Sequence, residues 1–128
     1  MITVKTAELT GAQLDYAVGL ANGYIAYPED SVEQGKVWHL NRDTAPFGEI
    51  MYVEDYTPST CWNAAVPIIE KHLHAFDHMQ SKDRVCAIIK RADLKNGGWD
   101  YGYGPTVLIA AMRCYVTYKL GNEVEVPS

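Results

Sequence analysis

The sequence predicts a small α+β domain in which three helices cover a largely antiparallel sheet. Three observations lead to this class. Two segments carry apolar residues at helical spacing, a third segment near the C-terminus is apolar over most of a helix's circumference, and short β-rich runs lie between them. The 128 residues have the size of one domain, and neither a repeat nor a linker divides residues 1–128.

The first helix is predicted to run from Gly11 to Ala21. Thr10 precedes it and Gln13 follows three residues later, which is the pattern of a capping box. The pair Asn22-Gly23 then provides a left-handed stop.

Two strands are predicted next, from Lys36 to Leu40 and from Glu49 to Val53, because both runs are rich in residues that favour strands. Residues 41–48 between them have the composition of a turn, so the simplest arrangement is an antiparallel hairpin. The segment from Pro28 to Ser31 is polar and is predicted to be a loop.

A second helix is predicted after Trp62, with Asn63 as its cap and Pro67 in its first turn. Its buried stripe is Val66, Ile69, Leu73 and Phe76, and the helix should end at residues 81–83. The run from Arg84 to Lys90 is the best strand pattern in the chain.

Residues 93–104 are predicted to be irregular because they hold four glycines, which permit tight turns, among large aromatic residues. Pro105 is expected to begin a helix that runs from Thr106 to Leu120 and ends at Gly121. This helix is so apolar that it is either the centre of the core or part of a subunit interface, and we expect a homo-oligomer, most simply a dimer. Its Arg113 should be paired, since an isolated buried charge is costly.

The small residues Ala110, Ala111 and Cys114 on that helix would let another element approach its backbone closely. Their side chains are small, so they form a row with little side-chain volume along the helix. We therefore expect a neighbouring segment to pack there.

Composition restricts the classes of partner. The 11 basic and 16 acidic residues give a net charge of −5 and a pI near 5.2, which disfavours general binding to nucleic acid or to an anionic membrane. No apolar run approaches the roughly 18 residues of a membrane span. Three widely spaced cysteines and an N-terminus without a signal-peptide pattern indicate reduced thiols in the cytoplasm.

Glu70, His74 and His78 are spaced by four residues, and on a continuous helix they would form one column able to hold zinc or nickel. This gives an alternative function, a small metal-dependent enzyme. A solvated helix face is the simpler interpretation, because the HExxH pattern of zinc hydrolases is absent. No cofactor is expected otherwise, and His72 should pack at the boundary of the core.

Cys61 is the only cysteine placed just ahead of a helix, where the N-terminal field favours a thiolate, and His39 is one of its possible partners. A packing role or an exposed thiol is the simpler interpretation. Cys86 and Cys114 lie in apolar runs and should be buried and inert.

The aromatic residues before the last helix suggest a binding surface, since tyrosine and tryptophan stack on planar ligands and a helix N-terminus attracts anions. The glycine spacing is not that of a P-loop, and neither a GxSxG elbow nor a dinucleotide fingerprint is present. We expect a non-enzymatic interaction or small-ligand module, with a nucleotide as one candidate ligand. The predicted contact residues are Tyr56, Trp62, Trp99, Tyr101, Tyr103 and Thr106. The second alternative is a purely structural subunit whose aromatic loop only packs.

Residues 56–70, Tyr-Thr-Pro-Ser-Thr-Cys-Trp-Asn-Ala-Ala-Val-Pro-Ile-Ile-Glu, resemble the signature of the bacteriophage NinX-like family, in which Tyr-Ser-Pro-Ser-Thr-Asp-Trp leads into Pro-Ile-Ile-Glu. Residues 105–126 resemble its C-terminal helix and tail, and residues 5–15 resemble its N-terminal helix. The resemblance implies a phage accessory protein in the cytoplasm of the infected bacterium, without a known activity, and an α/β/α sandwich-like fold. Cys61 stands where the family has aspartate, so any cap or ligand contribution of that acid should be lost.

Overall fold

A computed structural model describes residues 2–31, 35–42, 50–52, 57–79, 84–91 and 98–126, and it confirms the α+β class. Its described elements are β1 (Ile2–Lys5), a 3₁₀ turn (Thr6–Glu8), α1 (Gly11–Ala21), β2 (Tyr24–Ser31), β3 (Gly35–Arg42), β4 (Ile50–Tyr52), α2 (Trp62–His72), β5 (Ala75–Met79), β6 (Arg84–Arg91), β7 (Gly98–Gly104), α3 (Val107–Leu120) and β8 (Glu123–Val126). All strand pairs described are antiparallel.

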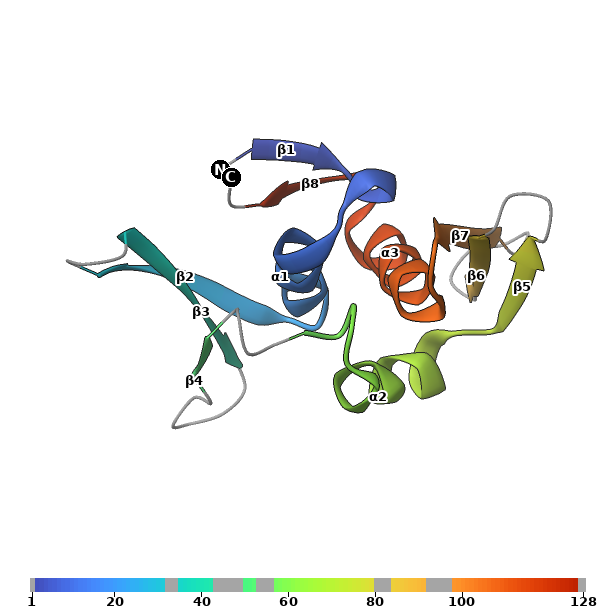
Figure 1. The fold of residues 1–128 in the computed structure, drawn as a ribbon, viewed down its shortest axis with the longest axis horizontal. Helices are drawn as coiled ribbons and strands as arrows, with labels where there is room; N and C mark the ends of the chain where they lie inside the picture. The colour runs from blue at the N-terminus through green and yellow to red at the C-terminus, as the bar shows by residue number, and fades with distance from the viewer. Residues whose placement is uncertain are drawn as a thin grey trace.

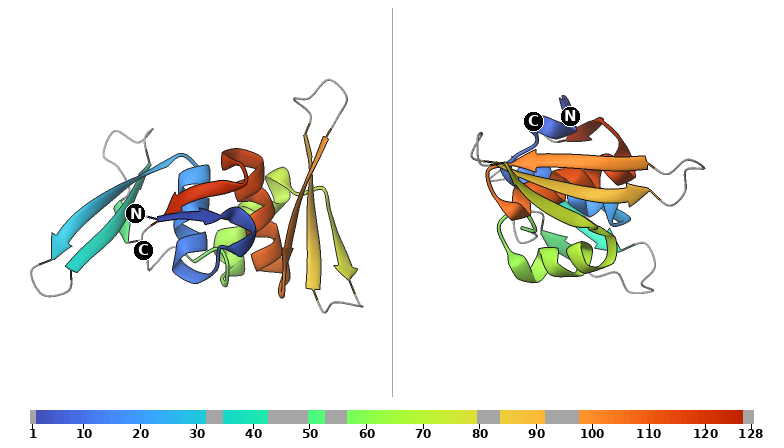
Figure 2. Two further views of the ribbon diagram at one scale, coloured as in Figure 1. Left: turned by 90° about the horizontal axis from the view of Figure 1, so that it is seen from above. Right: turned by 90° about the vertical axis from the view of Figure 1, so that its right-hand side faces the viewer.

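The strands are divided over three small sheets, in the orders β1-β8, β2-β3-β4 and β5-β6-β7. Figure 1 shows the three helices at the centre, with the β2–β4 sheet extending to one side and the β5–β7 sheet closing the other. The left view in Figure 2 shows the same order of layers, and both views place β1 beside β8. The β1-β8 pair joins the two ends of the described chain, from Ile2 opposite Val126 to Lys5 opposite Glu123.

The first helix has the predicted bounds, Gly11–Ala21, and Gly23 follows it with a left-handed φ of 86°. One detail of the prediction is wrong, because Thr10 is the N-cap residue but its side chain makes no capping hydrogen bond. The apolar side of α1 enters the core through Leu14, Ala17 and Val18.

The predicted hairpin is confirmed, since β3 pairs with β4 and places Leu40 opposite Met51. The segment from Pro28 to Ser31 is not a loop, because it continues β2 and pairs with β3. β2 lies at the edge of its sheet, where the missing N–H of a proline is tolerated. Tyr24 to Ser31 is thus a strand that the sequence pattern did not reveal.

The second helix differs from the prediction at both ends. It starts at Trp62, with Cys61 as the N-cap residue in place of Asn63, so Pro67 lies in the second turn. It ends at His72, and residues 75–79 form β5. The change of direction is fixed by a hydrogen bond of 2.8 Å from the backbone N–H of His74 to the carbonyl oxygen of Ile88 on β6.

The strand predicted from Arg84 to Lys90 is confirmed as β6. Residues 98–104, predicted to be irregular, form β7, which pairs with β6 along its whole length. β7 lies directly against α3 at Gly102 and Gly104. A Cβ atom added at Gly102 would lie 2.6 Å from Cβ of Cys114, so only glycine permits this approach, and the small row on α3 receives it as predicted.

α3 is the centre of the core of the described chain. Seven of its residues are buried, namely Leu108, Ala110, Ala111, Met112, Cys114, Tyr115 and Val116. Pro105 precedes the helix and is not its first residue, and the hydroxyl oxygen of Thr106 accepts a capping hydrogen bond from the N–H of Ile109 at 3.2 Å. Gly121 ends the helix with a φ of 93°.

Arg113 on α3 is paired, as expected, but with backbone carbonyl groups. Its Nε donates to Leu9 O at 2.9 Å and its terminal nitrogen donates to Tyr103 O at 2.7 Å. Burial lowers the pKa of this guanidinium. Arg113 therefore ties the segment before α1 and the end of β7 to the central helix.

Candidate binding surface

The aromatic residues of β7 lie on one side of the strand because successive side chains of a strand point to opposite faces. Gly102 and Gly104 face α3, so Trp99, Tyr101 and Tyr103 point away from it. Their exposed fractions are 47%, 48% and 39%. We call these three side chains the aromatic face.

Two cations accompany the aromatic face from the neighbouring strand β6. Cζ of Arg84 lies 4.6 Å from the ring centroid of Tyr103, and Nζ of Lys90 lies 5.9 Å from that of Trp99. Both distances are in the range of cation–π interactions. The pairing of β6 with β7 explains this arrangement, because Lys90 is opposite Trp99 and Cys86, two residues from Arg84, is opposite Tyr103.

His74 adds a third ring at one end of the aromatic face. Its ring centroid lies 5.1 Å from that of Trp99, with the planes at 61°. This edge-on contact supports the tryptophan from the side of β5 and leaves it half exposed.

At the other end of the aromatic face, Tyr103 contacts the side chains of Arg84 and Cys86 on β6. Burial is the main cause that raises its pKa, while the positive charge of Arg84 acts in the opposite direction. The phenol therefore stays neutral at physiological pH and offers its ring to a ligand.

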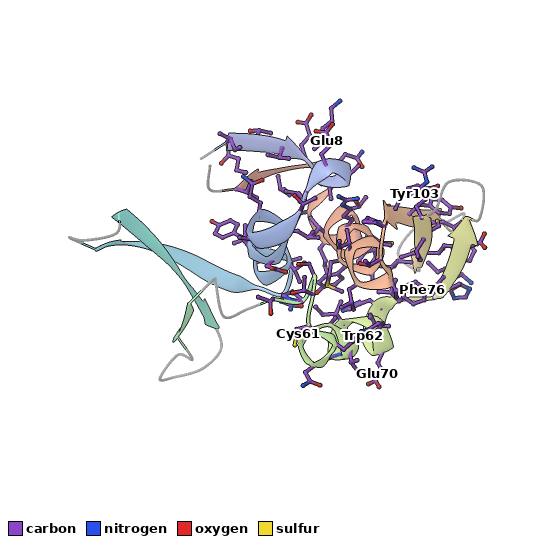
Figure 3. The ribbon with its side chains drawn as sticks, viewed as in Figure 1. Glu8, Cys61, Trp62, Glu70, Phe76 and Tyr103 are labelled. Carbon is purple, nitrogen blue, oxygen red and sulfur yellow. The ribbon has the colours of Figure 1, made fainter. Side chains whose placement is uncertain are left out.

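The other predicted contact residues do not join this surface as one cluster. Trp62 is 53% exposed but begins α2, away from Tyr103 on β7 (Figure 3). The hydroxyl group of Thr106 is engaged in capping α3. Tyr56 lies outside the described residues.

Sequence reasoning missed the role of Arg84, Lys90 and His74. Arg84, Cys86, Ile88 and Lys90 alternate with Val85, Ala87 and Ile89 on β6, so period-two patterning already placed them on one face. What was lacking was the recognition that residues 98–104 form the neighbouring strand.

The helical column proposed for a metal does not exist. Glu70 is on α2 and points outward in Figure 3, His74 follows the end of that helix, and His78 belongs to β5. Within the described part of the chain, no three histidine, cysteine or acidic residues are grouped to hold a metal ion. His72 packs at the boundary of the core, with its ring centroid 4.9 Å from that of Tyr115, and burial lowers its pKa.

The cysteine predictions are confirmed for the two residues in apolar runs. Cys86 and Cys114 are buried, and burial raises the pKa of the Cys114 thiol to about 12. Cys114 Sγ donates to the carbonyl oxygen of Asp100 at 3.2 Å, which anchors α3 to β7. Cys61 is half-buried at the start of α2, and the side chain of His39 lies outside the described residues.

The Tyr56–Glu70 motif has a structural role at the entrance to α2. Pro58 and Ser59 are buried, and the N–H of Ser59 donates to the carboxylate of Asp15 on α1 at 2.8 Å. The N–H of Cys61 donates to Thr57 O at 2.8 Å, which closes the turn before the helix. The motif thus ties the turn before α2 to α1 and leaves Trp62 53% exposed.

No helix in the described ranges is both long and apolar enough to cross a membrane.

Comparison with known proteins gives one family. A search of curated proteins finds no match. The family model described as "Bacteriophage P22, NinX" matches residues 5–119, which include α1, α2 and all strands from β2 to β7. The chain therefore belongs to the bacteriophage P22 NinX family.

Proposed function

We propose that this phage protein is a non-enzymatic accessory module that binds a nucleotide on its aromatic face. The observation that supports this is the row of three exposed rings on β7 with a cation at each end. Rings of tyrosine and tryptophan bind planar bases by stacking, and a lysine or arginine beside them neutralises a phosphate. We place its site of action in the cytoplasm of the infected bacterium.

The charge of the molecule supports a nucleotide over a purely apolar ligand. The whole chain has a net charge of −5, yet two of its cationic side chains, Arg84 and Lys90, lie beside the exposed rings. Cations beside exposed aromatic rings favour an anionic ligand that also has a π face. A nucleoside phosphate combines both groups.

Thermal denaturation with nucleoside monophosphates and dinucleotides tests the proposal. A ligand that binds only the native state at ten times its Kd stabilises it by about 1.4 kcal/mol, which raises the Tm of a domain of this size by about 4 °C. We expect this rise in the native protein and its loss in the double variant Trp99→Ala/Tyr101→Ala. Phe76→Ala is the matched control, because Phe76 is a 40% exposed aromatic residue of the same sheet on the opposite face.

Two results would refute the proposal. One is the absence of any rise in Tm with all nucleotides tested. The other is a rise that the double variant retains in full, since the ligand would then bind elsewhere.

Self-association is a separate proposal. The sequence argument for a dimer relied on the apolar surface of α3, and most of that surface is buried within the chain itself. We retain a two-fold dimer as the expected state. Light scattering should give about 29 kDa, twice the chain mass of 14.3 kDa, and a constant value of 14.3 kDa at all concentrations would refute it.

A further inference from the structure

We infer that the natural ligand of the aromatic face is a single strand of nucleic acid, bound by stacking of successive bases on β7. This inference rests on the proposed function, because it uses the same three rings. The inference goes beyond the proposed function because it names a polymer, and not a single nucleotide, as the ligand.

The spacing of the rings supports a polymer. Residues two apart on one face of a strand are separated by about 6.7 Å, and stacked bases are about 3.4 Å apart. One base therefore fits between neighbouring rings, in contact with both. Three rings in a row provide two such positions, from Trp99 to Tyr101 and from Tyr101 to Tyr103.

The positions of the cations support an extended backbone that crosses the whole row. Lys90 is opposite Trp99 at one end, and Arg84 contacts the ring of Tyr103 at the other. Along β6 these two residues are six positions apart, about 20 Å. A single nucleotide cannot reach both, whereas a short oligonucleotide can.

Arg84 provides a second, independent observation. Its Nε is buried and has no hydrogen-bond partner among the described residues. A buried donor of a charged group without a partner is unfavourable, so Arg84 would gain a hydrogen bond if its guanidinium turned outward to a phosphate oxygen. Among the described residues of this face, Asp77, opposite Cys86, is the only acidic one.

β7 is the outer strand of its described sheet, in the order β5-β6-β7, so its rings are reached from one open side. A duplex does not present the faces of its bases, because they are stacked on each other inside the helix. The net charge of −5 also disfavours the many phosphate contacts that duplex binding requires. The inference is therefore restricted to single strands.

Fluorescence anisotropy with a labelled oligothymidylate of twelve nucleotides tests the inference. We expect the oligonucleotide to bind at least tenfold more tightly than thymidine monophosphate and more tightly than a duplex of equal length. Since stacking on one ring typically changes affinity by about tenfold or more, Tyr101→Ala should weaken binding by that factor, whereas Tyr101→Phe should not. Phe76→Ala serves as the control for an exposed ring on the other face.

Salt dependence tests the role of the two cations. Two phosphate contacts predict a slope of about −1.4 in log K against log salt, since each contact contributes about −0.7 for single strands. Arg84→Gln/Lys90→Gln should bring the slope close to zero. Lys5→Gln/Lys119→Gln, at exposed positions on β1 and α3, is the charge-matched control, and it should leave the slope unchanged.

The possible failures are distinguishable. If the monophosphate binds on the aromatic face and the oligonucleotide binds no more tightly, the inference is wrong and the proposed function stands. If the duplex binds as well as the single strand, the inference is also wrong. If neither ligand binds, both are wrong.

Discussion

The backbone N–H of Ser59 donates a hydrogen bond of 2.8 Å to the carboxylate of Asp15, across 44 positions of sequence. Both residues are buried, with exposed fractions of 3% and 4%. Burial is the largest influence on Asp15 and raises its pKa, while hydrogen bonding from Ser59 opposes the rise. The carboxylate therefore fixes the turn before α2 to α1 at the cost of desolvating a charge.

The raised pKa predicts how Asp15 affects stability. A carboxyl group that binds its proton more tightly in the folded state stabilises that state below the unfolded pKa of 3.8, and this contribution is lost as pH rises through the folded pKa. Asp15→Asn keeps an acceptor for Ser59 without the charge. We expect its free energy of unfolding to increase relative to the wild type as pH rises from 4 to 7, measured by urea denaturation.

Asp15→Ala should instead lower the free energy of unfolding by about 1–3 kcal/mol, because the buried N–H of Ser59 loses its acceptor. Asp77→Asn, at an exposed position on β5, is the control for the removal of one acidic charge. If the difference in the free energy of unfolding between wild type and Asp15→Asn stayed constant from pH 4 to 7, the raised pKa of Asp15 would be contradicted.

Gly102 predicts a large effect of a single methyl group. A Cβ atom there would collide with the backbone of Ala110 and Cys114, which cannot move without shifting α3. We expect Gly102→Ala to lower the free energy of unfolding by about 3 kcal/mol or more in denaturant titration.

Gly104→Ala gives the graded comparison. Its nearest neighbour would be a side-chain atom, Cγ2 of Ile109 at 2.8 Å, with Ala110 N at 2.9 Å. A side chain yields more easily than a backbone, so this variant should be less destabilised than Gly102→Ala. If Gly104→Ala lost more stability than Gly102→Ala, the prediction that contact with the α3 backbone is the more costly of the two would be wrong.

These glycines also explain why β7 was mistaken for irregular chain. Glycine-rich composition usually indicates turns, but here Gly102 and Gly104 alternate with Tyr101 and Tyr103 and allow a strand to lie on a helix backbone. The alternation was visible in the sequence. What the sequence does not show is that α3 packs against these glycines, which is a tertiary contact.

β5 was missed for a related reason. Val66, Ile69, Leu73 and Phe76 have helical spacing, and no proline or glycine interrupts the run after Ile69. The pairing of His74 and Ala75 with Ile88 ends the helical pattern, and no local signal announces a contact with β6. By contrast α1, α3 and β6 were predictable because their own periodicity and end signals agree.

The candidate site was predictable in part. Trp99, Tyr101 and Tyr103 were identified from composition, and the structure brings them onto one face. Arg84 and Lys90 were not identified, since their position depends on the register between β6 and β7. Trp62 was grouped with these rings on residue type alone, although it belongs to a different element.

The N-cap position of α2 offers a stabilising substitution. Cys61 occupies this position without a side-chain capping bond, and the family resemblance predicts aspartate there. An aspartate oxygen accepts hydrogen bonds from the free N–H groups of the first turn and suits the helix dipole. We expect Cys61→Asp to raise the free energy of unfolding by about 1 kcal/mol in denaturant titration, while Cys61→Ala gives no gain.

The caps of α1 and α3 form a matched pair. Thr106 accepts a hydrogen bond from Ile109 N, whereas Thr10 makes no such bond. Thr106→Ala should therefore cost about 1 kcal/mol of stability and Thr10→Ala clearly less, as measured by thermal denaturation. Equal losses would contradict the difference between the two caps.

The three thiols should react with disulfide reagents at different rates. Cys86 and Cys114 are buried, and the pKa of Cys114 is raised to about 12, so both are protected in the native protein. We expect one rapid equivalent, from half-buried Cys61, and three after denaturation. Cys61→Ser should abolish the rapid phase, and its persistence would show that a buried thiol is accessible.

The pairing of β1 with β8 has a consequence for biosynthesis. Ile2 lies opposite Val126, and the N–H of Thr6 donates to Asn122 O at 2.8 Å, so β1 meets its partner only after α3 and then β8 have been synthesised. Until residues 123–126 leave the ribosome, β1 has no complementary edge, and closure of so long a loop delays the contact further. A nascent chain stalled before this point would carry β1 unpaired, and such an exposed strand is a target for the host's chaperones and proteases.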